Sequence, residues 1–212
     1  MPGIANLSIV EFQERINRFD QRYVNDWNGW LNTQPNVRAA QLGIVLRRWQ
    51  ACRPNRMRRI QAEQQHAAPY LEDLITQAAQ YLQILQNFDI RDNASFTPQN
   101  CNSLVQLWGI FQNLSYHGRT RNGLAGVVGI SKAVLLLTDG RVGPAFDSKV
   151  RGHLGLGNVA SANQWINALC TASRDIQAFE ANNQTTLQQA VPQPFAGLQS
   201  GRIYDMALGP GG

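Results

Sequence analysis

The sequence predicts an all-α fold, built as an array of many helices. In most segments the apolar residues recur at spacings of three or four, which is the period of an amphipathic helix. Side chains that commonly cap helices precede several of these segments, and no stretch shows the alternation of a half-buried strand. With 212 residues and 43% apolar content, the chain is long enough to bury a sizeable core. We expect one helical domain over residues 1–212, and the alternative is two lobes, 1–116 and 117–212.

Four helices are expected in the N-terminal half, and each has a recognisable start signal. Ser8 and Glu11 form a capping box, and a turn at Pro35 separates the first helix from the second. Pro69 and Thr97 mark the two later starts. The apolar and aromatic stripes of these segments indicate core packing. The expected helices span 8–32, 37–52, 70–88 and 97–116.

In the C-terminal half, a glycine-rich turn that begins at Gly123 leads into a helix over 129–138. This helix is apolar on nearly every face, so we expect it to be buried. A second turn ends at Asp147, which is a good N-cap for a short helix. Two further helices are expected, over 161–180 and 198–208.

Lys132 is the anomaly of the buried helix and a candidate catalytic residue. It lies in the first turn, where the helix dipole and partial burial both disfavour the charged ammonium. A neutral lysine amine is a nucleophile that forms Schiff bases, which arginine cannot do. The chain has 17 arginines and two lysines, Lys132 and Lys149, and both lysines lie in this region. The alternative is a lysine whose ammonium reaches solvent and an Asp147 that only caps its helix.

The charge of the chain favours a polyanionic partner, because the net charge is +5 and the pI is near 9.5. Between residues 47 and 59 there are six arginines and almost no acid. Arginine matches phosphate through two parallel hydrogen bonds, so this cluster fits a nucleic-acid backbone. The alternative is a solvated charged face.

Several classes of protein are not expected. The chain has no run of 18 apolar residues and no signal peptide at its N-terminus, so we expect a cytoplasmic protein without a membrane partner. The three cysteines and three histidines are scattered and form no CxxC motif, which argues against a disulfide framework or a metal site. We expect no cofactor and a monomer.

The central segment resembles the helix-hairpin-helix base-excision DNA glycosylases, especially the lysine-bearing group similar to 8-oxoguanine DNA glycosylase. The resemblance rests on Gly126-Val-Val-Gly129-Ile-Ser-Lys132, a leucine-rich helix, and Pro144-x-x-Asp147-Ser, about 35 residues in all. The turn is longer than the compact Gly-Val-Gly of that family, and Lys132 and Asp147 are closer in sequence. No four-cysteine iron-sulfur loop follows, unlike in the endonuclease III and adenine glycosylase branches.

This resemblance implies an enzyme that removes a damaged or modified base from double-stranded DNA, with AP lyase activity. Asp147 would stabilise the cationic sugar, and Lys132 would attack C1′ to form a Schiff base. The residues expected to contact DNA are Gly126, Gly129, Arg141, Lys149 and Arg151. The aromatic residues that would stack on an extruded base are Phe146, Trp108 and Trp165, for which core packing is the alternative. Two other functions stay open: a non-catalytic nucleic-acid-binding module and a structural helical interaction protein.

Overall fold

The structure, a computed structural model, describes residues 3–51, 71–114 and 124–211. In these ranges the chain forms helices and no strand, so the predicted all-α fold is confirmed. The α-helices are α1 Ile9–Arg18, α2 Gln21–Leu31, α3 Arg38–Arg48, α4 Leu71–Ile84, α5 Pro98–Phe111, α6 Val127–Leu137, α7 Ser148–His153, α8 Ala162–Asn183, α9 Leu187–Ala190 and α10 Ser200–Leu208. Short 3-10 turns extend or precede several of them, and two of these turns occupy the ends of the helices predicted over 70–88 and 97–116.

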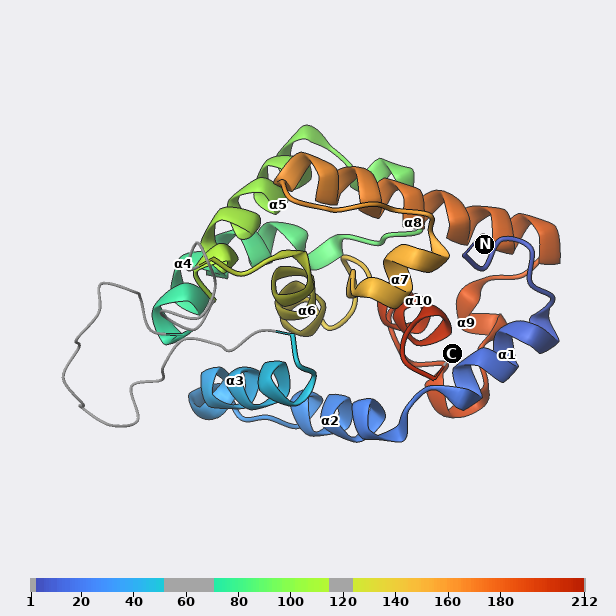
Figure 1. Cartoon of the computed structure of the whole chain (residues 1–212), viewed down its shortest axis with the longest axis horizontal. Coiled ribbons are helices and arrows are strands. Elements are labelled where there is room, and N and C mark those ends of the chain that lie inside the picture. Colours follow the sequence, from blue (N-terminus) through green and yellow to red (C-terminus); the bar gives the residue numbers. More distant parts are fainter. Residues whose placement is uncertain (1–2, 52–70, 115–123, 212) are drawn as a thin grey trace.

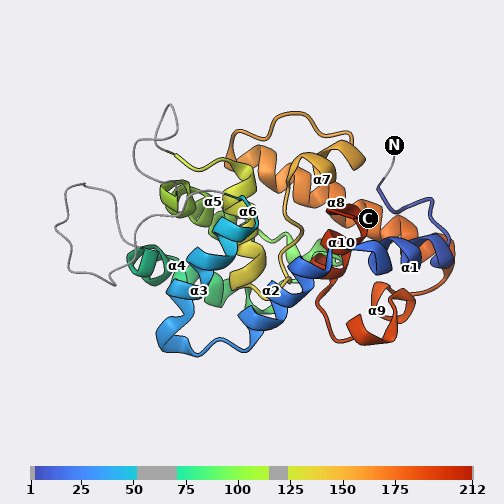
Figure 2. The same cartoon turned by 60° about the horizontal axis from the view of Figure 1, so that its bottom comes forward.

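Helix α6 lies at the centre of the array (Figure 1). In that view α5 and α8 lie on one side of it and α2 and α3 on the other. Figure 2 shows α3 beside α6 from another direction, and both α3 and α5 contact it. Nine of the eleven residues of α6 are buried, so the predicted burial on nearly every face is confirmed. This burial includes Lys132, which is only 4% exposed, so its ammonium does not reach solvent. The predicted first-turn position of Lys132 is wrong, because α6 begins at Val127 and the lysine is its sixth residue.

The single helix predicted over 8–32 is wrong, because the chain breaks between α1 and α2. Phe19 has an extended backbone conformation, and the carboxylate of Asp20 accepts a hydrogen bond from the amide of Arg22. Asp20 therefore caps a new helix, and its own amide donates to the carbonyl of Pro210 at 3.0 Å. A local cap and a contact with the far end of the chain outweigh the helical period of the apolar residues.

Helix α10 is buried along its whole length and holds an ion pair inside the core. Arg202 donates to Asp205 at 2.6 Å, and its guanidinium lies 4.6 Å from the ring of Trp27. A Cβ atom at Gly201 would collide with the carbonyl oxygen of Gly140. The backbone of α10 therefore packs directly on the loop between α6 and α7.

The buried apolar side chains form one cluster that includes residues from both of the lobes considered above. The described parts of the two alternative lobes, 1–116 and 117–212, therefore share a core. Throughout the described ranges, each helix is too short or too polar to cross a membrane.

Candidate functional site

Lys132 lies in a polar and aromatic environment made by three helices. Its Nζ donates a hydrogen bond to the backbone carbonyl of Trp49 at 3.0 Å, and Trp49 is the C-cap of α3. The centroids of the Tyr23 and Trp49 rings are 5.7 and 5.9 Å from the same nitrogen. A carbonyl at a helix C-terminus and two ring faces all favour a cation. In this structure the amine is thus sheltered by α2 and α3.

Asp147 is the N-cap of α7, as predicted. Its Oδ1 accepts hydrogen bonds from the amides of Lys149 and Val150 at 2.9 and 3.0 Å. The side chain is half-buried, and its carboxylate lies at the positive end of the helix. A carboxylate in this position can stabilise a positive charge that develops nearby.

Two hydrogen bonds hold the loop before Asp147 against its neighbours. The amide of Phe146 donates to Ser131 Oγ on α6 at 2.9 Å. The amide of Ala145 donates to Asp205 Oδ1 on α10, also at 2.9 Å. Since Ser131 directly precedes Lys132, the helix that carries the lysine is tied to the loop that carries the aspartate. The pattern Ser-Lys in α6 therefore has a structural role in addition to any chemical one.

Charge interactions link the side chains of Tyr23 and Asp205 to the residues of the candidate site. Burial raises the pKa of the Tyr23 phenol, and the negative charge of Asp147 raises it further. Burial also raises the pKa of the Asp205 carboxyl, against the lowering effects of Arg202 and Lys132. Asp147 adds to the rise at Asp205. The charges of Lys132 and Asp147 thus both act on the carboxylate of α10, and Tyr23 stays a neutral phenol at neutral pH.

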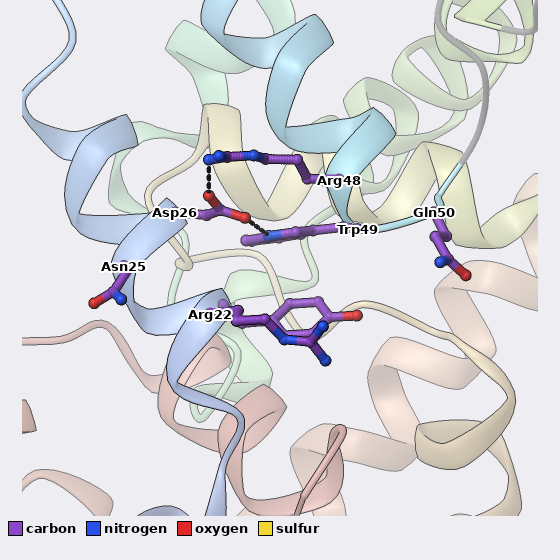
Figure 3. A pocket seen from close by; sticks show the side chains of 7 residues that line it. Arg22, Asn25, Asp26, Arg48, Trp49 and Gln50 are labelled. Carbon is purple, nitrogen blue, oxygen red and sulfur yellow. Dashed lines mark hydrogen bonds and ion pairs between the residues drawn. The ribbon is translucent and has the colours of Figure 1, made fainter.

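A cavity of about 510 Å³ is lined by Tyr23 and Trp49, the two aromatic residues whose rings lie near Lys132 Nζ, and Figure 3 shows the Trp49 side chain there. We call it the Trp49 cavity. Asp26 braces it, because its carboxylate accepts from Arg48 at 2.6 Å and from the indole of Trp49 at 3.1 Å. The lining residues come from α2 and from the end of α3, and they are Arg22, Tyr23, Asn25, Asp26, Arg48, Trp49 and Gln50.

A second cavity, of about 480 Å³, lies at the start of α6 and brings two predicted DNA-binding residues together. We call it the Gly126 cavity. Gly126 is the N-cap of α6 and has no side chain to cap the first amides, and Arg151 of α7 lines the same space. Lys149 lies exposed in the first turn of α7. An uncapped helix N-terminus beside an arginine favours an anion.

Two other predicted DNA-binding residues do not join this group. Gly129 is buried inside α6. Arg141 follows the opposite end of α6, about 15 Å from its start at 1.5 Å per residue, and forms an ion pair with Asp139 at 3.6 Å. Of the arginine cluster at 47–59, Arg47 and Arg48 are described, and the other four lie outside the described residues.

The three predicted base-stacking residues have packing roles in this structure. Phe146 and Trp165 are 0% and 1% exposed, and Trp108 is 6% exposed. The rings of Trp108 and Trp165 contact each other, with centroids 5.9 Å apart. Stacking on an extruded base needs an accessible ring face, which Phe146 and Trp165 do not offer here. Core packing, the alternative interpretation, describes them better.

Tyr23 and Trp49 belong to the aromatic stripes for which the sequence predicts core packing, and their contact with Lys132 was not predicted. Nothing in the spacing of α2 and α3 indicates that these helices meet α6 at its lysine. The described ranges contain no group of three or more histidine, cysteine or acidic residues arranged to hold a metal ion. Searches against protein-family models, curated proteins and solved structures give no match for this chain.

Proposed function

We propose that this protein is a base-excision DNA glycosylase that uses Lys132 as its nucleophile and has AP lyase activity. The observation that carries the proposal is the hydrogen bond between Ser131 and Phe146, which fixes the lysine helix to the loop that ends in Asp147. A reaction that needs an amine and a carboxylate at one carbon requires such a fixed relation between the two. The resemblance of the same segment to lysine-bearing glycosylases supports this interpretation.

The chemistry follows from the two side chains. The ammonium of Lys132 loses a proton, and its lone pair forms a bond to C1′ of the nucleotide. The glycosidic bond breaks with its electron pair going to the base, which takes up one proton and leaves. The carboxylate of Asp147 stabilises the positive charge that develops on the sugar. Ring opening then moves one N–H proton from the lysine nitrogen to O4′ as the C1′–O4′ bond breaks, which leaves a protonated imine on Lys132. Loss of a C2′ proton allows β-elimination of the 3′ phosphate.

The Gly126 cavity provides the proposed contact with the DNA backbone. A phosphate would accept hydrogen bonds from the first amides of α6 and from the guanidinium of Arg151. Lys149, exposed in the first turn of the same helix, adds a second positive charge at the start of α7. Such contacts position a duplex without reading its sequence.

Reductive trapping tests the proposal. The protein is incubated with a duplex that has a single abasic site and with borohydride, and a covalent protein–DNA adduct is expected. Lys132→Gln should abolish the adduct and leave DNA affinity within about two-fold, since one charge among many contributes little to binding. Lys149→Gln, which removes the only other lysine, is the matched control and should still trap. An adduct that persists in Lys132→Gln would assign the chemistry to another amine and overturn the proposal.

The sheltered position of Lys132 favours a second candidate, the non-catalytic DNA-binding module. A buried ammonium bonded to a carbonyl at 3.0 Å is also what a structural lysine looks like. This candidate predicts salt-sensitive duplex binding and no adduct in the trapping experiment. It also predicts that Lys132→Arg retains DNA affinity.

A further inference from the structure

The end of α3, at Trp49, lies over the amine of Lys132 in the proposed site, and we call it the cover. The carbonyl of Trp49 accepts from Lys132 Nζ, and the side chain of Lys132 is almost without solvent exposure. A substrate carbon cannot reach the amine while this carbonyl holds it. Access to Lys132 therefore requires residue 49 to move.

One carboxylate on α2 sets the position of this cover. Asp26 accepts hydrogen bonds from the Trp49 indole at 3.1 Å and from Arg48 at 2.6 Å, and Figure 3 shows it between the two side chains. The Asp26 side chain is 10% exposed, so its carboxylate is largely buried, while its bond to Arg48 lies at the surface. The Trp49 ring also contacts Tyr23, with centroids 5.3 Å apart. The closed position is thus held by a small set of contacts between α2 and α3.

The residue after the cover is strained. Gln50 has a φ of 50°, in the left-handed region that glycine tolerates best. It ends α3 together with a hydrogen bond from the Ala51 amide to the Leu46 carbonyl at 3.0 Å. A non-glycine residue at this position makes the closed end of α3 less stable than it would otherwise be. The hydrogen bonds of Asp26 therefore stabilise the closed position of Trp49, and the backbone conformation of Gln50 destabilises it.

The Trp49 cavity is lined by Tyr23 and Trp49, whose rings lie near Lys132 Nζ, and by polar side chains of the kind that a sugar phosphate needs. Arg22 and Arg48 have side chains 86% and 64% exposed, and each is oriented by an aspartate. Those ion pairs use only part of the five N–H donors of a guanidinium. The side-chain amide of Asn25 adds a further donor and acceptor.

We propose that the Trp49 cavity receives a deoxyribose 5′-phosphate of DNA and that its arrival displaces the Trp49 carbonyl from Lys132. The inference rests on the proposed function, because it assigns the regulation and the sugar-phosphate contacts of the same site. In the free protein the lysine is protected from adventitious aldehydes. In the complex, the phosphate binds at Arg22 and Arg48 while the sugar takes the place of the carbonyl.

Lysine labelling of the free protein tests the cover. The protein is treated with an amine-acetylating ester, and the labelling rates of Lys132 and Lys149 are compared by peptide mass spectrometry. Asp26→Ala should raise the rate of Lys132 relative to Lys149 by about ten-fold, because it removes two hydrogen bonds of the closed state. Gln50→Gly should lower the same ratio by about five-fold, because it relieves the strain of the closed state.

Asn28→Ala is the control for this labelling, since Asn28 is exposed on α2 and does not line the Trp49 cavity. It should leave the ratio unchanged. Thermal unfolding of each variant shows whether the fold is retained, and Gln50→Gly serves as the test if Asp26→Ala unfolds. Equal ratios in wild type and in both test variants would overturn the inference.

A second measurement tests the sugar-phosphate contacts. The protein is incubated with 2-deoxyribose 5-phosphate or with 2-deoxyribose, each with cyanoborohydride, and the adduct on Lys132 is quantified. The phosphorylated sugar should react at least about ten-fold more efficiently, and Arg22→Gln should remove most of this preference. The control Arg18→Gln should retain it, because Arg18 lies on α1 outside the cavity. Equal reaction of the two sugars would overturn the phosphate assignment.

The two proposals fail in different ways. Failure of the proposed function appears as absence of the Lys132 adduct on the abasic duplex. If the inference about the cover is wrong, the labelling ratio of Lys132 to Lys149 is the same in wild type, Asp26→Ala and Gln50→Gly. That measurement uses free protein and involves no DNA chemistry.

Discussion

Ser131 and Phe146 are joined by a hydrogen bond in which the Phe146 amide donates to Ser131 Oγ at 2.9 Å. The same oxygen donates its own proton to the carbonyl of Val127 at 2.7 Å, so it bridges the first turn of α6 and the loop before α7. Both partners are buried. This single hydroxyl fixes the distance between the segments that carry Lys132 and Asp147.

Replacing Ser131 tests that bridge. Ser131→Ala leaves the buried amide of Phe146 without its acceptor, so we expect a loss of about 1–3 kcal/mol in the free energy of unfolding. Trapping on an abasic duplex should slow by more than DNA affinity falls, because the lysine and the aspartate lose their fixed relation. Urea denaturation and single-turnover trapping measure the two effects. Ser148→Ala, at an exposed position of α7, is the control and should change stability by less than about 0.5 kcal/mol.

Asp147 has two separable roles, a helix cap and a proposed negative charge at the sugar. Asp147→Ser keeps a hydroxyl that caps α7, so the free energy of unfolding should change little. Asp147→Ala removes the cap and should cost about 1 kcal/mol. Both variants lose the charge, and base release should slow by about 100-fold or more in each. If Asp147→Ser released bases as fast as wild type, the aspartate would be only a cap.

The Gly126 cavity predicts that Arg151, and not Arg141, contacts a DNA phosphate at the start of α6. Arg151→Ala should weaken duplex binding for all sequences and lower the slope of log affinity against log salt by about one unit. Arg141→Ala should leave the slope unchanged, because Arg141 pairs with Asp139 at the far end of α6. Binding measured from low to moderate salt checks both. Equal effects of the two variants would contradict the proposed phosphate site at Gly126.

The environment of His153 predicts that the free energy of unfolding depends on pH below about 6.5. Partial burial lowers the pKa of its imidazole from the ordinary value of 6.5, and the positive charges of Arg15 and Lys149 lower it further. Below pH 6.5 the unfolded chain therefore binds more protons at this residue than the folded protein does. Stability should rise with pH up to that value and be lost as the pH falls below it, by less than about 1 kcal/mol because solvent screens a partly exposed ring.

The variant His153→Gln isolates this effect. It should flatten the change in unfolding free energy between about pH 5 and 6.5, relative to wild type. Urea denaturation at several pH values measures it. A wild-type slope that the variant reproduces unchanged would assign the pH dependence to other groups.

Local patterns in the sequence predicted most of the helices. The capping box at Ser8, the N-cap at Asp147 and the apolar composition of α6 are all local features, and the structure has each of them. A predicted helix boundary was wrong where a distant contact determines it, as at Asp20, whose amide donates to the carbonyl of Pro210. The short helix α9 was not predicted, although Thr186 and Gln189 form its capping box.

The sequence by itself determined that Lys132 belongs to a buried helix and that Asp147 caps the next, because both facts follow from residue types a few positions apart. Only the tertiary structure decided what surrounds them. The carbonyl of Trp49 meets the lysine across 83 positions of sequence, and Asp205 holds the loop before Asp147 across 60. Such contacts depend on how α3 packs on α6 and how α10 packs on the loop before α7. Side-chain packing between distant segments leaves no periodic signal in either one.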